Sequence, residues 1–433
     1  MKSADLAVVN CEQLLTCRGQ IPKRAGALQD VGLLEKACIA SFKGKIIFLG
    51  EEKKFKKEVR LEEDGIYIDG TGLVGLPGFV DSHTHLPFAG TREEEFVLRI
   101  KGFSYQELAK KGLGIQTTVK ATRQASKKEL LSLSLNRLDS MLLLGTTTAE
   151  AKSGYGLNLK DEIKQLETLE ELRKRHPIDI VPTFMGAHEI PEEYKSRKND
   201  YIEFLIHKIL PEVKEKNLAK FFDVFCEEGV FSLEETRKLV GAAKAAGFKI
   251  KIHADEFSPL GGAKLAAEEE ATSADHLINI TEEGIQELAK SQTVATLLPA
   301  VSFFLMHEKK APARKLIEEG AIVAIASDFN PGSSMTESML FVLQLAVFTL
   351  KMSIEEAINA ATANAAFALA KHEEVGSLEV GKKMDVVLWD VPNYPILVYH
   401  LGINPLKHVI KNGKIVVKDG KIVAKEDGVP RED

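Results

Sequence analysis

Two histidines separated by one residue, His83 and His85, have the side-chain type and spacing best suited to chemistry in this sequence. They follow the apolar run 76–82, which predicts a β-strand. Residues two apart on a strand project to the same side, so both imidazoles can reach one point in space. A metal ion is the usual reason to bring two neutral imidazoles together. Taken alone, the pair also fits two surface histidines at a strand end, because short motifs recur by chance.

Three further polar residues support the metal interpretation. His253, His276 and Asp328 each stand at or near the C-terminal end of a short apolar run. In a (β/α)8 barrel the C-terminal ends of the strands surround one mouth, where the catalytic groups gather. The sequence therefore predicts a site of this kind at the mouth of a barrel.

Alternating strand and helix patterns run from residue 77 to about residue 370 and predict a parallel sheet. The eight expected strands are 78–82, 146–151, 178–183, 221–226, 249–253, 273–276, 293–297 and 322–326. Helical patterns between them include 161–175, 233–246, 281–290 and 311–319. Eight strand–helix units favour a closed barrel over an open sheet. The sequence contains no P-loop and no GxGxxG motif entering a helix, so no motif in it indicates a nucleotide site instead.

Both ends of the chain show short strand patterns without helices between them. At the N-terminal end they cover 5–15, 37–42 and 45–49, and at the C-terminal end 385–389, 408–417 and 421–424. Asn412-Gly413 is a hairpin-turn signal. Neither end alone has enough strands for a stable core. We therefore expect an α/β protein, with a (β/α)8 TIM-type barrel at 77–370 and a small β-sandwich domain built from both termini, 1–76 and 371–433.

The composition fits a globular protein and disfavours several other classes. Hydrophobic residues make up 44% and charged residues 28% of the 433 positions. The net charge of −6 argues against a nucleic-acid partner, which usually requires a basic face. No signal peptide and no apolar stretch long enough to span a bilayer is visible, so we expect a cytoplasmic protein without a membrane partner. The four cysteines show no CxxC spacing and are interpreted as reduced thiols.

The order of the motifs along the chain resembles the amidohydrolase superfamily of metal-dependent hydrolases. The resemblance rests on HxH after the first expected strand, His253 and His276 on the fifth and sixth, and Asp328 after the eighth. It extends to segments 72–85 and 376–389, and so covers nearly the whole chain. It implies a divalent or trivalent metal cofactor, with zinc or iron favoured. The implied ligands are His83, His85, His253 and Asp328.

The same resemblance bears on metal number and on the roles of other residues. Two-metal relatives commonly carry a carboxylated lysine at the end of the fourth strand, and the run 221–226 has none, so one metal per chain is expected. Lys152, on another strand, is interpreted as structural. His276 would hydrogen-bond the water or the developing oxyanion. Asp328 and Glu256 would move protons, and the sequence does not decide which is the principal acceptor.

Four loops, 88–92, 150–157, 183–191 and 327–333, resemble those of the imidazolonepropionase family, which opens a ring in histidine degradation. The resemblance implies hydrolysis of 4-imidazolone-5-propionate to N-formimidoyl-L-glutamate by a metal-activated water. Arginine suits the carboxylate of such a small-molecule substrate. The implied substrate contacts are Arg92, Tyr105, Tyr155, His188, Glu256, Asn330, Gly332 and Ser333.

Alternatives remain open at this level. Arg92 could instead pair with an acidic residue in 93–95, and His188 could be a loop histidine bonded to Glu189. The chain could be another mononuclear amidohydrolase, such as a nucleobase aminohydrolase. It could also be a barrel that binds a metal or metabolite without catalysis. A homodimer is implied only by the resemblance.

Overall fold

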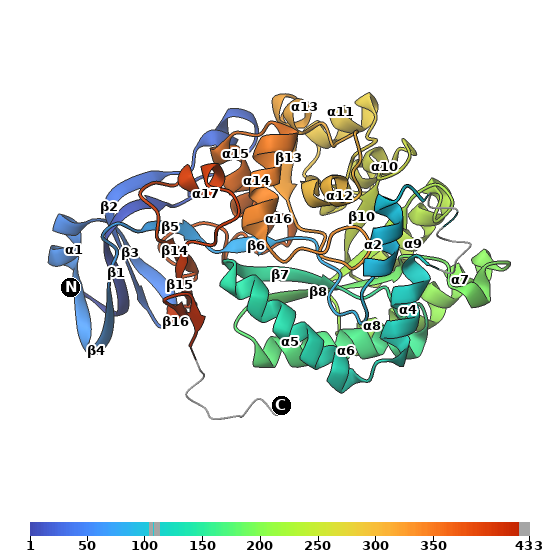
Figure 1. The fold of residues 1–433 in the computed structure, drawn as a ribbon, viewed down its shortest axis with the longest axis horizontal. Coiled ribbons are helices and arrows are strands. Elements are labelled where there is room, and N and C mark those ends of the chain that lie inside the picture. Colours follow the sequence, from blue (N-terminus) through green and yellow to red (C-terminus); the bar gives the residue numbers. More distant parts are fainter. Residues whose placement is uncertain (104–106, 108–112, 424–433) are drawn as a thin grey trace.

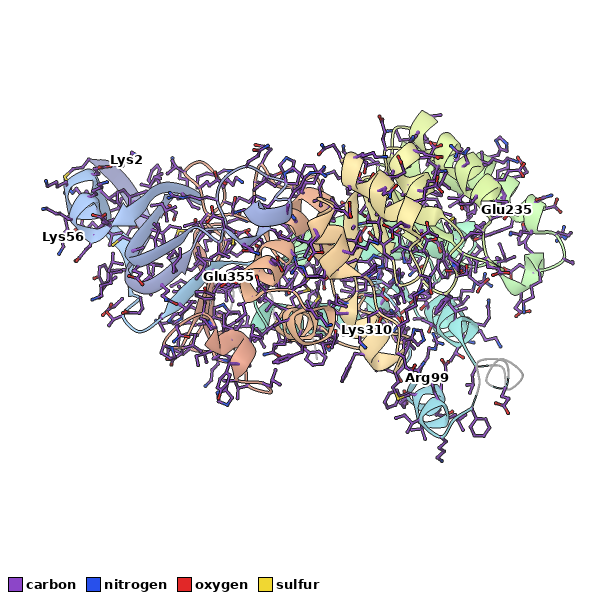
Figure 2. All side chains as sticks on the ribbon, turned by 90° about the horizontal axis from the view of Figure 1, so that it is seen from above. Lys2, Lys56, Arg99, Glu235, Lys310 and Glu355 are labelled. Carbon is purple, nitrogen blue, oxygen red and sulfur yellow. The ribbon has the colours of Figure 1, made fainter. Side chains whose placement is uncertain are left out.

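Two β-sheets organise the chain, one inside a ring of helices and one at the end of the molecule (Figure 1). The computed structural model describes residues 1–103, 107 and 113–423. Figure 2 shows how elongated the arrangement is: Lys2 and Lys56 mark the sheet at one end, and Glu235 lies at the opposite end of the helical part. Among the described residues, no helix combines the length and the apolar character needed to cross a membrane.

The inner sheet has eight parallel strands in sequence order. They are β6 (Phe79–Asp81), β7 (Thr146–Lys152), β8 (Asp179–Ala187), β9 (Phe221–Cys226), β10 (Lys249–Ala254), β11 (Ser273–His276), β12 (Val294–Leu297) and β13 (Ile322–Ile325). Each matches one expected strand, so the predicted barrel is confirmed. β8 continues four residues beyond its expected end, past an irregular register between Phe184 and Ala187.

The first and last barrel strands meet just beyond their ends. The backbone N–H and the hydroxyl of Ser327 donate hydrogen bonds of 3.0 and 2.5 Å to the Asp81 carboxylate. The Asp328 N–H donates to the His83 carbonyl, and the His85 N–H to the Phe329 carbonyl, both at 3.0 Å. The HxH motif is therefore part of the seam that brings β6 and β13 together.

Helices surround the barrel (Figure 1). Several begin at a serine whose hydroxyl accepts a backbone N–H, as Ser126 does before α5 and Ser232 before α9. The α-helices of this part are α2 (Glu93–Ile100), α4 (Ile115–Gln124), α5 (Lys127–Leu143), α6 (Leu159–Arg175), α7 (Lys198–Phe204), α8 (Leu210–Glu215), α9 (Leu233–Ala245), α10 (Gly262–Glu268), α11 (Glu282–Lys290), α12 (Pro299–Phe304), α13 (Ala313–Glu318), α14 (Met339–Leu350), α15 (Ile354–Ala360) and α16 (Ala363–Ala368). Short helical turns are η1 (Ala25–Gln29), η2 (Glu192–Tyr194) and η3 (Leu205–Ile209).

The second sheet is mixed and combines strands from both termini. It contains β1 (Lys2–Leu15), β2 (Leu33–Phe42), β3 (Lys45–Glu51), β4 (Val59–Asp69), β5 (Val74–Pro77), β14 (Val386–Trp389), β15 (Leu406–Lys411), β16 (Lys414–Lys418) and β17 (Lys421–Ile422), with α1 (Glu52–Glu58) and α17 (Ile396–Tyr399) in the same parts of the chain. β5 joins the two ends, because it pairs with β1 on one side and with β14 on the other. Leu6 and Val8 share a buried cluster with Val386 and Leu388, so the termini form one core.

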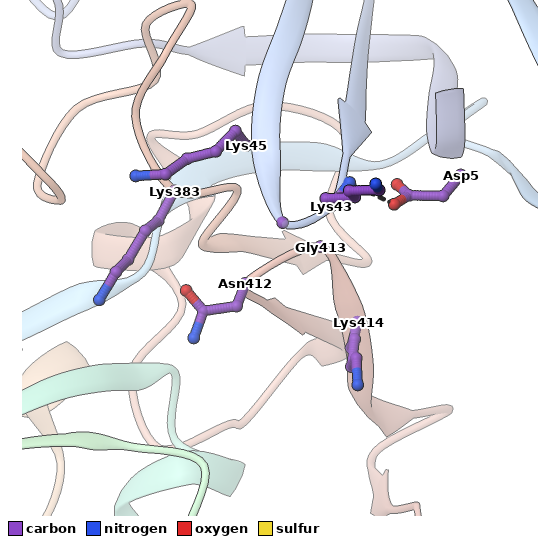
Figure 3. A pocket seen from close by; sticks show the side chains of 8 residues that line it. Asp5, Lys43, Lys45, Lys383, Asn412, Gly413 and Lys414 are labelled. Atoms are coloured by element: carbon purple, nitrogen blue, oxygen red, sulfur yellow. Dashed lines mark hydrogen bonds between the residues drawn. The ribbon is translucent and has the colours of Figure 1, made fainter. Parts of the chain in front are cut away.

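Two tight turns of this sheet, one at Gly44 and one at Gly413, pack against each other (Figure 3). Gly413 has a φ of +69°, which glycine adopts readily, and a Cβ on Gly44 would lie 2.8 Å from the Asn412 carbonyl oxygen. A surface hollow of about 260 Å³ lies at this joint and is lined largely by lysines. In Figure 3 the side chains of Lys45, Lys383 and Lys414 point in different directions rather than towards one centre. The hollow is therefore a joint between the termini and not a candidate for the predicted chemistry.

Candidate metal centre and substrate rim

The four predicted ligands converge in the mouth of the barrel. Asp328 Oδ1 lies 3.2 Å from His83 Nε2 and 3.1 Å from His85 Nε2, and His253 Nε2 lies 3.4 Å from His85 Nε2. In a tetrahedral zinc site with bonds of about 2.0–2.1 Å, ligand atoms are about 3.3 Å apart. All four side chains are buried. Their spacing thus matches the coordination sphere of a single ion.

The hydrogen bonds of the imidazoles support the same conclusion. His83 Nδ1 donates to Asp275 Oδ2 at 2.6 Å, and His253 Nδ1 donates to Asp223 Oδ1 at 3.0 Å. A proton on Nδ1 leaves Nε2 with a lone pair directed at the cluster. Among the residues that the structure describes, Nε2 of His83 and Oδ1 of Asp328 have no hydrogen-bond partner. Buried lone pairs facing one another are costly without a shared cation, so these residues fit a metal.

The protonation states also suit metal binding. Burial lowers the pKa of His83 to about 4 and also lowers the pKa of His85, so both rings are neutral near pH 7. Burial alone would raise the pKa of Asp328. The close approach of the His83 and His85 imidazoles outweighs that effect and holds the pKa of this carboxyl well below its usual range.

His276 faces the same cluster from the end of β11. Its ring centroid lies 5.0 Å from that of His253, and neither of its ring nitrogens has a hydrogen-bond partner in the described part of the chain. It can group with His83 and Asp328 as three ligand atoms within 4.8 Å of one another. The φ of His276 is +82° and that of Asp328 is +53°, conformations that cost energy and recur at functional sites. The geometry allows His276 either to bind a metal or to hydrogen-bond what the metal binds.

Glu256 is placed to exchange a proton with this cluster. Its Oε1 lies 3.5 Å from His276 Nδ1, and the side chain is buried. Burial, together with the negative charge of Asp328, raises the pKa of Glu256 well above its usual value. A carboxyl group with a raised pKa can hold a proton near neutral pH and release it.

Tyr155 and His188 line the mouth next to the predicted ligands. The His188 ring stacks on the His85 ring at 4.9 Å between centroids, and the Tyr155 ring lies 5.3 Å from His188. His188 Nδ1 lies 3.0 Å from the Gly154 carbonyl oxygen. Gly154 has a φ of +112°, and a Cβ there would lie 2.8 Å from the Met185 carbonyl oxygen. Glycine therefore permits the close packing of the two loops that hold Tyr155 and His188.

Arg92 lies at the rim in a two-bond ion pair. Its Nε and Nη2 donate to the Glu95 carboxylate at 2.8 and 2.6 Å, which is the alternative partner that the sequence allowed. Arg92 also lies against Gly332, since a Cβ at Gly332 would overlap the guanidinium. The structure thus brings together two of the predicted substrate contacts.

The loop after β13 ties its polar groups to Asp328. Asn330 Nδ2 donates to Asp328 Oδ2 at 3.0 Å, and Asn330 Oδ1 accepts the N–H groups of Gly332 and Ser333. The Ser333 hydroxyl lies 3.2 Å from Asp328 Oδ2. These contacts hold the Asp328 carboxylate and the rim loop as one unit. Tyr105, also predicted to contact substrate, lies outside the described residues.

Comparison with known proteins identifies the family. A model of the amidohydrolase family matches residues 74–416, which include all four predicted ligands. The chain belongs to the amidohydrolase family. The imidazolonepropionase of Symbiobacterium thermophilum is 47% identical over 416 residues, covering 96% of this chain and 98% of the relative. That of Alkaliphilus oremlandii is 47% identical over 412 residues, covering 95% and 97%. The chain groups with the imidazolonepropionases inside the family.

Solved structures support the amidohydrolase fold. An adenosine deaminase from Xanthomonas campestris with bound zinc has a TM-score of 0.71 at 16% identity, covering 98% of this chain and 95% of that one. An atrazine chlorohydrolase from Arthrobacter aurescens complexed with zinc has a TM-score of 0.67 at 16% identity, covering 97% of both chains. At this identity the likeness concerns the fold.

Sequence reasoning missed several charged residues of this amidohydrolase. Asp275 and Asp223 hold His83 and His253, as described above, and the buried residues Glu150 and Lys251 lie close to them, as does Lys152, which the sequence analysis had named as structural. The available signal was a charged residue at alternate positions of an otherwise apolar barrel strand. Inward-facing positions of a strand recur every second residue, so such charges must face the barrel interior.

One amide connects two rim loops of this amidohydrolase. Gln165, buried on α6, accepts the Tyr155 N–H at 3.2 Å and donates to the Pro87 carbonyl oxygen at 2.7 Å. Glu162, one turn earlier, accepts the N–H groups of Gly156 and Leu157. The helix therefore sets the position of the Tyr155 loop relative to the chain that leads to Arg92.

Proposed function

We propose that this chain opens the ring of 4-imidazolone-5-propionate by hydrolysis and releases N-formimidoyl-L-glutamate. The observation that carries the proposal is the buried meeting of three imidazoles and Asp328 directly beside Tyr155 and His188. Relatives at 46–47% identity over nearly the whole chain are named imidazolonepropionase, which supports this choice of substrate.

The proposed cofactor is one divalent or trivalent metal ion, with zinc or iron preferred. His83, His85, His253 and Asp328 would hold it. When bound, such an ion supplies a Lewis acid that lowers the pKa of a water molecule towards neutrality.

The chain's own residues perform the remaining steps. The water oxygen bonds to the ring carbonyl carbon, the C–N bond to the adjacent ring nitrogen breaks, and the proton lost by water reaches that nitrogen. Asp328 and Glu256 are the proposed proton carriers, because both carboxylates border the cluster. His276, whose two ring nitrogens have no hydrogen-bond partner among the described residues, would donate a hydrogen bond to the oxyanion.

The rim would recognise the substrate's polar groups. Arg92 is the proposed partner of the propionate carboxylate, since guanidinium binds carboxylates through paired hydrogen bonds. In binding, it would turn from Glu95 or share its donors between the two carboxylates. The other proposed contacts are Tyr105, Tyr155, His188, Glu256, Asn330, Gly332 and Ser333.

A small substrate panel tests the proposal. We expect turnover of imidazolone propionate, weak turnover of its neutral amide analogue, and none of a nucleobase. Turnover of the nucleobase alone would replace the proposal with a nucleobase aminohydrolase. Metal binding without turnover of any compound would make the chain a binding protein.

Two further measurements test the remaining proposals. Sedimentation would test the proposed homodimer, and fractionation of the source cells would test the proposed cytoplasmic location.

A further inference from the structure

A network of buried charged side chains lies beneath the metal centre and ends at a predicted ligand histidine on each side. On one side of this network, His253 contacts Asp223, whose Oδ2 lies 2.7 Å from Lys152 Nζ. On the other side, His83 contacts Asp275, whose Oδ2 lies 3.6 Å from Lys251 Nζ. The two halves meet at one atom, Glu150 Oε2. The five residues Glu150, Lys152, Asp223, Lys251 and Asp275, which we call the floor, are all 0% exposed.

Glu150 is the midpoint of the floor. Its Oε2 lies 2.6 Å from Lys152 Nζ and 3.5 Å from Lys251 Nζ, and its Oε1 accepts the Thr183 hydroxyl at 2.5 Å. We propose that Glu150 is a positioning residue for the metal: it holds the two lysines in place, and each lysine holds the carboxylate that aims one ligand histidine. Within residues 1–103, 107 and 113–423, the Glu150 side chain has no hydrogen bond or ion pair with a predicted ligand.

The strand register explains why one carboxylate can span both halves. Lys251 pairs with Asp223 between β10 and β9, and His253 pairs with Asp275 between β10 and β11. The floor residues therefore stack in levels inside the barrel, directly under the ligands. Glu150 comes from β7, across the interior from β10, and closes the set from the opposite side.

The charges of the floor favour a cation above it. Three carboxylates against two ammonium groups leave one net negative charge in a place closed to water. Replacing Glu150 by glutamine makes that sum zero and removes the shared partner of both lysines. A buried ion-pair network adds little net stability because of the cost of desolvation. The network lies between two predicted ligand histidines, so positioning those histidines is a reason for the network other than stability.

The experiment measures zinc binding to the metal-free protein by competition with a coloured chelator, and the melting temperature with and without zinc. Residues that orient metal ligands commonly change metal affinity by roughly 10- to 100-fold, and Glu150→Gln should weaken zinc binding by about tenfold or more. Its zinc-dependent rise in melting temperature should shrink accordingly.

Two further variants keep the test decisive. Glu356→Gln removes another fully buried carboxylate, which pairs with Arg314 away from the mouth, and should leave zinc affinity within about twofold of the wild type. If Glu150→Gln does not fold, Thr183→Val removes only the hydroxyl that orients Glu150, and zinc binding should weaken a few-fold.

The outcomes separate this inference from the ligand set on which it rests. If Glu150→Gln, or Thr183→Val in its place, loses only melting temperature and keeps wild-type zinc affinity, Glu150 is structural and the inference fails. If His253→Ala binds zinc as tightly as the wild type, the proposed ligand set fails first. Neither readout depends on substrate, so failure to hydrolyse imidazolone propionate would leave this result standing.

Discussion

The floor and the rim of the barrel mouth are built on different principles. The floor lies on four strands, is closed to water, and pairs every charge with another side chain. The rim, here Arg92, Tyr155, His188 and Asn330, lies on loops whose position depends on backbone contacts and on single amides such as Gln165. In a barrel enzyme the strands fix the reacting centre while loop variation selects the compound. Changes in the centre should therefore reduce kcat and metal content, and changes in the rim should raise KM.

The largest effect is expected at the centre itself. His253→Ala removes a proposed ligand together with its link to Asp223, so the metal should be lost. A metal ion contributes several kcal/mol of transition-state stabilisation, and kcat should fall by roughly a thousandfold or more. Elemental analysis of protein purified without added metal should find one metal per chain in the wild type and none in the variant. His207→Ala, at an exposed histidine on η3, is the control. Two tightly bound metals in the wild type would contradict the mononuclear site.

His276→Ala tests whether the centre contains a group that is not a ligand. Because its ring nitrogens have no hydrogen-bond partner within the described ranges, the main loss should be the proposed hydrogen bond to the oxyanion. Removing such a donor costs roughly a hundredfold or more in kcat, and the metal content should stay near that of the wild type. Loss of metal equal to that of His253→Ala would instead assign His276 to the ligand set, which its grouping with His83 and Asp328 also allows.

The sequence predicted much of the centre because that part depends on local pattern. Ligand types at strand ends identify the mouth, and period-two alternation shows which side chains face inward. The pair His83–Asp275 was beyond that reasoning. The two residues are 192 positions apart and meet across the barrel interior, so their contact depends on strand tilt and on the distance between strands that are not neighbours.

The rim shows a second limit of the sequence. The run 92–95 allowed Arg92 either a substrate carboxylate or a neighbouring glutamate, and only the helical backbone of α2 shows that Glu95 is within reach. Likewise, nothing in the pattern of α6 marked Gln165 as the link between two loops. Loop positions follow from tertiary contacts that local propensity does not contain.

Arg92→Ala should sharpen the contrast between floor and rim. If Arg92 binds the propionate carboxylate, its loss removes a charge-assisted contact of about 1.5–3 kcal/mol, which is roughly 10- to 100-fold in KM. The metal content should not change, because Arg92 does not contact a predicted ligand. Lys101→Ala, at the exposed end of α2, controls for the loss of positive charge in the same segment.

A cycle of two enzymes and two ligands identifies the group that Arg92 binds. The neutral amide analogue should lose affinity on the wild type and little more on Arg92→Ala, so the two losses should couple rather than add. Simple additivity would show that Arg92 serves only its ion pair with Glu95 and that another group recognises the carboxylate.

The smallest effect is expected at Gln165, whose side chain bonds the backbone of Tyr155 but, among the described residues, no side chain of a proposed substrate contact. Gln165→Leu removes both hydrogen bonds that connect the Tyr155 loop to the Pro87 carbonyl. Each contributes about 1 kcal/mol, and part of that loss lowers the free energy of unfolding, so KM should rise only about three- to fivefold. Gln165→Glu retains an acceptor for the Tyr155 N–H and loses the donor to Pro87. A rise in KM for both variants would show that the link between the loops matters, whereas a rise for leucine alone would assign the effect to the Tyr155 loop. If kcat and metal content fall while KM is unchanged, Gln165 acts on the centre, and the division between floor and rim is wrong at this residue.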